Sequence, residues 1–277
     1  MTIGEDRQLK GYGGTLLARE FYRRGPEQRV SSAVSFLDIR RRFDFRSIEI
    51  GRWVTEPEKR RAAGLFHDAL CDLMQILQGP ESLISLRGTL GLQYGIGGRP
   101  GVAAHYVPAS RTFALAKNAG PGSIAHEWFH AFDHYICGKA FQSVRPGLFA
   151  SRAWLDEMPP VVHPLNARLQ ACFKAVLLDD AGQAPSVLFR QSMKQDELMG
   201  RCYYSQPEEM CARAFEAFVQ DASIKNAFLV KGTQASGDAR LGLYPQGEQR
   251  ARINAAFAAY FFGLGRALLR SGEGATP

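Results

Sequence analysis

Apolar side chains recur at helical spacing in three parts of the chain that carry no chemical motif. Residues 55–58 (Thr-Glu-Pro-Glu) form a capping box, and the pattern after them predicts a helix that stops at the Gly-Pro pair 79–80. A shorter helix is expected around residues 165–178, and an amphipathic helix near the C-terminus is expected to close the core. The apolar positions of the first and last helices are Phe66, Leu70, Leu73 and Leu77, and Ile253, Phe257, Tyr260, Phe261, Leu264 and Leu268.

Two short segments in the middle of the chain have strand character. Val102 to Val107 and Thr112 to Lys117 are joined by Pro108-Ala109-Ser110, which predicts a β-hairpin. If Thr112 to Lys117 forms the edge of a sheet, it could pair with an extended polypeptide by strand addition, although an ordinary hairpin packed on the core has the same pattern. These strands and helices together predict an α+β fold with a small mixed sheet and a helical C-terminal part.

The sequence His-Glu-Trp-Phe-His at residues 126–130 carries the strongest chemical signal. A turn cluster at 118–123 precedes it, and Ser123 could cap a helix that opens with the motif. Residues four apart share one helix face, so His126 and His130 can point at one ion, while Glu127 can act as a general base. This is the arrangement of zinc hydrolases, with a chance match on an ordinary amphipathic helix as the alternative.

Three nearby side chains have weaker claims to a role. Asp133 falls seven residues after His126 on the same helix face, where it could orient a ligand histidine. His134 lies further along the helix and is a poor candidate for a third ligand, because a straight helix carries it away from a point shared by His126 and His130. His105 has no partner at ligand spacing and is expected to be structural.

A second helix is predicted over residues 203–218, with Ser205 as its cap and Glu208 at the matching third position. Glu209, Arg213 and Glu216 form a charged stripe along it. A carboxylate from this helix could complete a site of two histidines and one glutamate. The alternative is that Glu208 and Glu209 only complement the helix dipole, as acids often do near a helix N-terminus.

The two segments together resemble zincin metallopeptidases of the gluzincin type, in which a glutamate from a later helix completes the metal site. Residues 209–215 (Glu-Met-Cys-Ala-Arg-Ala-Phe) are similar to the third-ligand helix of lethal-factor-like metallopeptidases, which places the ligand at Glu209 rather than Glu208. Segments 104–108, 114–117, 122–128 and 207–210 resemble the zincin-like domains of large polyvalent phage proteins, and also bacterial proteins labelled CLCA_X.

This resemblance implies a zincin-like fold, with an edge strand above the active-site helix. It implies Zn²⁺ as cofactor, bound by His126, His130 and Glu209. The long gap between the last two ligands implies an insertion at about residues 139–200 within a metallopeptidase domain at 55–277. Residues 1–54 would form a basic N-terminal subdomain.

Composition limits the remaining possibilities. With 277 residues and 45% hydrophobic content the chain can bury a substantial core. Five scattered cysteines argue for a reducing compartment, and no run approaches the roughly 18 apolar residues of a membrane span. The first ten residues lack the apolar core of a signal peptide. We therefore expect a cytoplasmic protein that does not enter a membrane.

Most of the net charge of +7 is N-terminal, since residues 1–61 hold fourteen Lys or Arg against nine Asp or Glu. The densest patch, Arg40-Arg41-Arg42 with Arg46, could contact nucleic acid or an acidic protein. No nucleic-acid-binding motif accompanies it, so a solvated basic face is the favoured interpretation.

Two functions remain open. The first is a zinc metallopeptidase acting on a protein or peptide, with Glu127 as base and Tyr203 or Tyr204 donating to the oxyanion. The second is a binding module in which zinc only joins two helices, and nucleic acid is one partner that such a module could have. The presence of Glu127 favours the first, because a structural zinc site does not need that carboxylate.

Overall fold

The computed structural model describes residues 20–29, 34–96, 104–117 and 122–273. Four of its strands form one mixed sheet in the order β2–β3–β5–β4. The first three strands are parallel, and β4 is antiparallel to β5. The strands of this sheet are β2 (Ser47–Ile50), β3 (Gly91–Tyr94), β4 (Ala104–Val107) and β5 (Thr112–Leu115).

The predicted hairpin is confirmed for residues 104–107 and 112–115, whereas residues 102 and 103 of the expected first strand lie outside the described residues. The expectation that Thr112 to Lys117 forms the sheet edge is wrong. β5 lies between β3 and β4, and the edge strand is β4. The buried side chains of β5 are consistent with its interior position. β5 lies inside the sheet because it pairs in parallel with β3, although β4 comes between these two strands in the sequence. A separate pair of short strands, β1 (Arg23–Arg24) and β6 (Lys225–Asn226), joins two distant parts of the chain.

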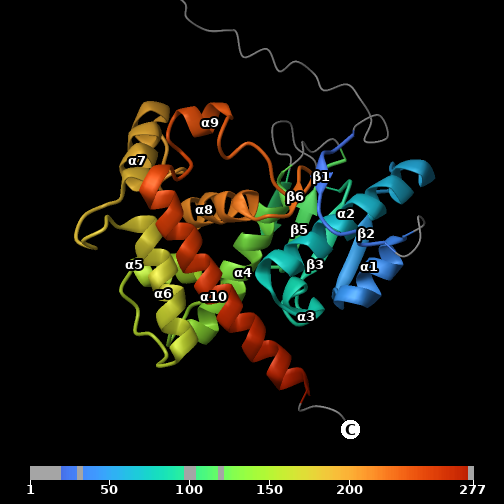
Figure 1. Ribbon diagram of the computed structural model, residues 1–277, viewed down its shortest axis with the longest axis horizontal. Helices are drawn as coiled ribbons and strands as arrows, with labels where there is room; N and C mark the ends of the chain where they lie inside the picture. Colours follow the sequence, from blue (N-terminus) through green and yellow to red (C-terminus); the bar gives the residue numbers. More distant parts are fainter. Residues whose placement is uncertain (1–19, 30–33, 97–103, 118–121, 274–277) are drawn as a thin grey trace, which may run out of the picture.

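Helices make up most of the described structure (Figure 1). α4 packs against β4 and β5 and also against α8, so it lies between the sheet and the C-terminal helices. In Figure 1, α1 and α2 lie to the right of α4, and α5, α6 and α7 lie to its left. The helices are α1 (Phe36–Phe43), α2 (Glu56–Leu77), α3 (Glu81–Ile84), α4 (Ile124–Ala140), α5 (Ala150–Leu155), α6 (Pro164–Leu177), α7 (Val187–Met199), α8 (Pro207–Asp221), α9 (Gly237–Arg240) and α10 (Gly247–Glu273).

The helix boundaries follow the sequence signals closely, with two exceptions in the capping. The capping box between Thr55 and Glu58 is present at the start of α2. Ser123 does precede α4, but its side chain makes no capping hydrogen bond. α8 is preceded by Gln206 rather than Ser205, whose hydroxyl donates to the Asp196 carboxylate at 2.6 Å. The predicted cap is lost because Asp196 competes successfully for Ser205.

A layer of aromatic rings holds α4, α8 and α10 together. Phe129 of α4 stacks on Phe215 of α8, with ring centroids 4.9 Å apart, and Trp128 lies 5.5 Å from the same ring. Phe257 and Phe261 of α10 complete the layer against Phe215. Aromatic side chains bury a large apolar area each, so this layer fixes the relative position of the three helices.

The architecture is a mixed α+β fold with small sheets, as the sequence predicts. Residues before 55 contribute α1 and β2, and Phe36 and Phe43 belong to the common hydrophobic core. The division of the chain at residue 54 and the insertion at 139–200 stay predictions. Among the described residues no helix combines the length and the apolar character that a membrane crossing requires.

Candidate metal centre

Three side chains from α4 and α8 converge as the sequence predicts. His126 and His130 share one face of α4, and their Nε2 atoms lie 3.0 Å apart. Glu209, near the start of α8, places one carboxylate oxygen 3.4 Å from Nε2 of His126 and the other 3.3 Å from Nε2 of His130. The charged stripe of α8 therefore faces the His-Glu-x-x-His helix, and Glu209 belongs to the cluster.

The spacing of these atoms fits a zinc ion. Ligand atoms about 2.0–2.1 Å from a tetrahedral ion lie about 3.3 Å from one another. The histidine Nε2 atoms lie 3.0 Å apart, and different oxygens of Glu209 lie 3.4 Å from His126 and 3.3 Å from His130. With one ligand atom taken from each residue, the three atoms lie within 4.8 Å of one another. Two imidazole nitrogens and one carboxylate are also a donor set that zinc prefers. Among the described residues, His126, His130 and Glu209 are the group of His, Cys, Asp or Glu side chains close enough together to hold a metal ion.

Sequence reasoning missed a second carboxylate on the same histidine. Glu216 places Oε1 3.4 Å from Nδ1 of His126, on the opposite side of the ring from Glu209. Metal-binding histidines commonly donate their second nitrogen to such a carboxylate, which fixes the ring orientation. Glu216 follows Glu209 by seven residues, so the two share a face of α8. That periodicity was the available signal.

The two carboxylates dominate the electrostatics of His126. Burial opposes the charged imidazolium, but the charges of Glu216 and Glu209 outweigh it and raise the His126 pKa well above its usual value. The Glu209 pKa is lowered: burial opposes ionisation, and hydrogen bonds with His126 and His130 more than compensate. The Glu209 carboxylate is therefore held in the ionised form that binding to a metal ion would require.

Glu127 lies beside the cluster without joining it. Its side chain is buried, and that burial raises its pKa, although the neighbouring charges of His126 and His130 act in the opposite direction. The charge of Glu209 adds to the increase. A carboxyl group with a raised pKa can accept and release a proton closer to neutral pH than an exposed glutamate can.

The two candidate tyrosines have different environments. Burial raises the Tyr203 pKa, and the charge of Glu209 and a hydrogen bond with it raise it further, while the charge of Glu127 contributes in the same direction. The residue as a whole is 38% exposed, so Tyr203 lies at the surface next to the cluster. Tyr204 instead packs under the guanidinium of Arg213, whose carbon lies 5.2 Å from the ring centroid. The structure brings Tyr203 to the site and gives Tyr204 a packing role.

Arg213 holds the start of α8 in place. Its buried side chain donates to the backbone carbonyl of Glu209 at 3.3 Å and to the hydroxyl of Ser192 at 3.3 Å. It also donates to the backbone carbonyl of Tyr204. Burial lowers the Arg213 pKa, against the opposing charge of Glu209. Arg213 thus connects α7, α8 and the tyrosine pair around the carboxylate ligand.

The expected role of Asp133 is not what the structure shows. Its buried carboxylate accepts from the backbone N–H of Ser151 at 2.9 Å and from the Ser151 hydroxyl at 2.5 Å. It therefore holds the start of α5 rather than a histidine. Nδ1 of His130 is buried and has no hydrogen-bond partner among the described residues. His134 lies outside the cluster, because its Nδ1 is 2.7 Å from the Tyr106 hydroxyl.

The comparison with protein families gives one partial match. The family model for large polyvalent protein-associated domain 1 matches residues 195–268. The chain is similar to this domain over that segment. The matched segment, well under half of the chain, contains α8 with Glu209 and Glu216, whereas α4 with both histidines lies outside it. No curated protein and no solved structure matches the chain.

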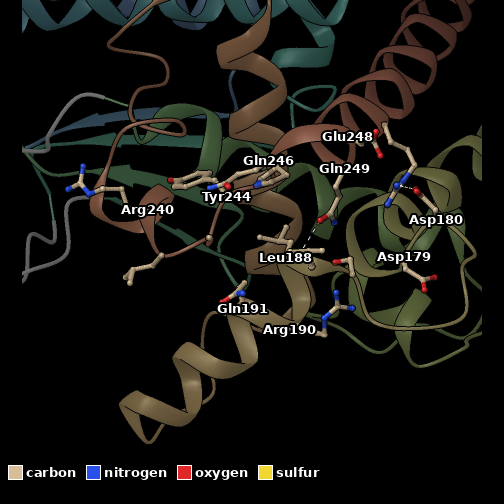
Figure 2. A pocket seen from close by; sticks show the side chains of 16 residues that line it. Asp179, Asp180, Leu188, Arg190, Gln191, Arg240, Tyr244, Gln246, Glu248 and Gln249 are labelled. Atoms are coloured by element: carbon tan, nitrogen blue, oxygen red, sulfur yellow. Dashed lines mark hydrogen bonds and ion pairs between the residues drawn. The ribbon is translucent and has the colours of Figure 1, made fainter.

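A pocket of about 580 Å³ lies between the starts of α7 and α10 (Figure 2). Tyr244 lines this pocket. Its pKa is raised mainly by burial, and the charge of Glu216 and a hydrogen bond with Glu216 raise it further. Several of its polar side chains already have partners: Gln249 accepts from the Leu188 backbone, and Arg252 pairs with Asp180. His126, His130 and Glu209 are not among its lining residues.

Proposed function

We propose that the protein is a zinc-dependent metallopeptidase of zincin type. The observation that carries this proposal is the convergence of His126, His130 and Glu209, whose ligand atoms lie within 4.8 Å of one another, beside the buried carboxylate of Glu127. A zinc site that only joins helices is usually closed by four protein ligands. Here three described side chains leave a position for water, and a general base lies next to it.

Each residue would have a distinct task in peptide hydrolysis. When bound, zinc would polarise the scissile carbonyl and increase the acidity of water. Glu127 would take the proton from the attacking water and pass it to the leaving nitrogen. Tyr203 would donate its phenolic hydrogen to the oxygen that becomes negative in the transition state.

The edge strand β4 supports a peptide substrate. Its outer backbone groups have no strand partner among the described residues, since β5 pairs only its other side. An extended peptide could hydrogen-bond to this edge by strand addition. β4 packs on α4. Burial dominates the raised pKa of Glu127, and the charge of His105 on β4 acts in the opposite direction, so this part of β4 lies near Glu127. A peptide paired with β4 would therefore lie over the metal ligands.

The decisive experiment is the Glu127→Gln substitution. The variant should keep its fold and its content of about one zinc per chain, because Glu127 is not a ligand, and should lose hydrolysis. Incubated with a cell extract, it should retain proteins that the wild type cleaves. Identical bound proteins for wild type and variant, with no cleavage products, would transfer support to the binding-module function. Full metal retention in His126→Ala would refute the metal site itself.

A further inference from the structure

One end of the main sheet carries a concentration of basic side chains. We call this group the basic end: Arg40, Arg46, Arg87, Arg111 and Lys139. The Arg40 side chain donates to the backbone carbonyl of Arg46. The Arg46 side chain donates to the backbone carbonyl of Ser110. The carbonyl of Arg111 accepts from the first residue of β3. These contacts place Arg40, Arg46 and Arg111 at the end of the sheet where Ser47, Gly91, Thr112 and Val107 lie side by side, whereas Arg87 lies in the segment before β3 and Lys139 near the end of α4.

The charges of the basic end are not neutralised internally. All five residues are exposed, and within the described part of the chain none lies within ion-pair distance of a carboxylate. Asp44 lies near the group, with its carboxylate facing Gly88, and is one acid against five cations. A surface of this kind attracts an anionic partner.

The basic end borders the metal centre. Lys139 lies over the ring of Tyr135 at 4.7 Å, and the charges of Arg87 and Arg111 act on the same phenol, lowering a pKa that burial raises. Arg111 also acts on His134, where it adds to the lowering of the pKa by burial. His134 follows the ligand His130 by one helical turn, about 6 Å along α4.

The edge strand connects the two regions. β4 packs against α4, with the Tyr106 hydroxyl 2.7 Å from Nδ1 of His134, and its Val107 end leads into the turn that carries Arg111. A peptide paired along β4 would pass from the metal ligands toward the basic end. The exposed cations lie at one end of such a peptide, so acidic side chains would be attracted to that end.

We propose that the substrate is an acidic polypeptide segment whose carboxylates lie on one side of the scissile bond, against the basic end. This rests on the proposed peptidase function. A polypeptide is favoured over a nucleic acid because the cations continue an unpaired strand edge, and a strand edge offers backbone hydrogen bonds that an extended peptide can complete. The acidic side chains would supply the selectivity, since a backbone edge alone accepts any sequence.

The test uses the zinc-loaded full chain with Glu127→Gln, so that binding is measured without cleavage. Fluorescence anisotropy compares three labelled twelve-residue peptides: one with four Asp or Glu in its N-terminal half, one with them in its C-terminal half, and one with Asn and Gln instead. One acidic peptide should bind at least about fivefold more tightly than the neutral one, and its advantage should shrink at high salt.

The second arm replaces the cations. Arg87→Gln with Arg111→Gln should weaken the favoured acidic peptide by about fivefold to twentyfold, at up to about 1 kcal/mol for each exposed charge pair. Arg24→Gln with Lys194→Gln removes two exposed charges elsewhere and should have no effect. Equal binding of acidic and neutral peptides, or equal effects of the two double variants, would overturn the proposal.

A nucleic-acid probe separates the competing partner. If single-stranded RNA or duplex DNA binds more tightly than either acidic peptide, and loses affinity in the Arg87 and Arg111 variant, the basic end is a nucleic-acid surface and the proposal is wrong. None of these results depends on hydrolysis. Zinc content and wild-type cleavage, measured separately, still decide the peptidase function.

Discussion

Removing the Glu216 carboxylate should weaken metal binding even though Glu216 is not expected to touch the ion. Glu216 contacts Nδ1 of His126 at 3.4 Å and is buried. Its negative charge orients the imidazole and increases the electron density at Nε2, the nitrogen that would bind zinc. Glu216→Gln keeps an acceptor of nearly the same shape but removes the charge. Glu216→Ala removes both.

The structure sets the expected size of each effect. Loss of a residue that orients a ligand histidine typically weakens metal affinity by about 10- to 100-fold, or about 1.4–2.8 kcal/mol. The 3.4 Å contact is long for a hydrogen bond, so loss of the charge alone in Glu216→Gln should give about tenfold. Glu216→Ala also leaves Nδ1–H of His126 buried without an acceptor, which should bring the loss closer to 100-fold.

The assay is competition for zinc with a chromophoric chelator at pH 8, where protons compete least for His126. Glu208→Gln is the matched control, because Glu208 lies on the same helix and pairs with Arg152 at 3.8 Å. Circular dichroism of the metal-free proteins verifies folding. If both Glu216 variants bind zinc within twofold of the wild type while His126→Ala does not, Glu216 has no role in orienting the histidine.

Three further predictions concern other residues of the site. Glu209→Gln should abolish stoichiometric zinc in elemental analysis and Glu208→Gln should preserve it; the reverse would move the ligand by one position. Tyr203→Phe should reduce kcat by about 10²–10³ without changing zinc content, whereas Tyr204→Phe should not, and equal activities would assign both rings to packing. Burial raises the Asp133 pKa to about 7, so the folded state disfavours its charge and loses stability as pH rises from about 4 to about 7. Asp133→Asn should remove a few kcal/mol of that loss in urea denaturation, and an unchanged pH dependence would contradict it.

Local patterns predicted the elements of the fold better than their order in the sheet. The capping box at Thr55 and the turn before His126 locate α2 and α4, because helix ends depend on neighbouring residues. Which strand occupies the edge depends instead on the pairing of β5 with β3, across residues far apart in sequence. Alternation within Thr112 to Lys117 carries no information about that neighbour.

The site shows the same division. Residues four apart on a helix must share a face, so His126 and His130 were predictable, and a resemblance supplied Glu209. Asp133 is on the same face as His126 but about 10 Å further along the axis, and its short side chain reaches α5 instead. Tyr244, which bonds to Glu216 from a loop after α9, has no pattern in sequence that connects it with the histidines.

The aromatic layer beneath the metal centre also has a consequence for ion selectivity. His126 and His130 belong to α4, and Glu209 and Glu216 belong to α8. The distance between the two histidines and the two carboxylates therefore depends on the distance between these helices. Phe129 against Phe215 fixes that distance at a point remote from solvent. The radius of ion that the cluster accepts is therefore decided largely by the bulk of core side chains. Trimming Phe215 would change that distance and so shift the preference among divalent ions, although every coordinating residue is retained.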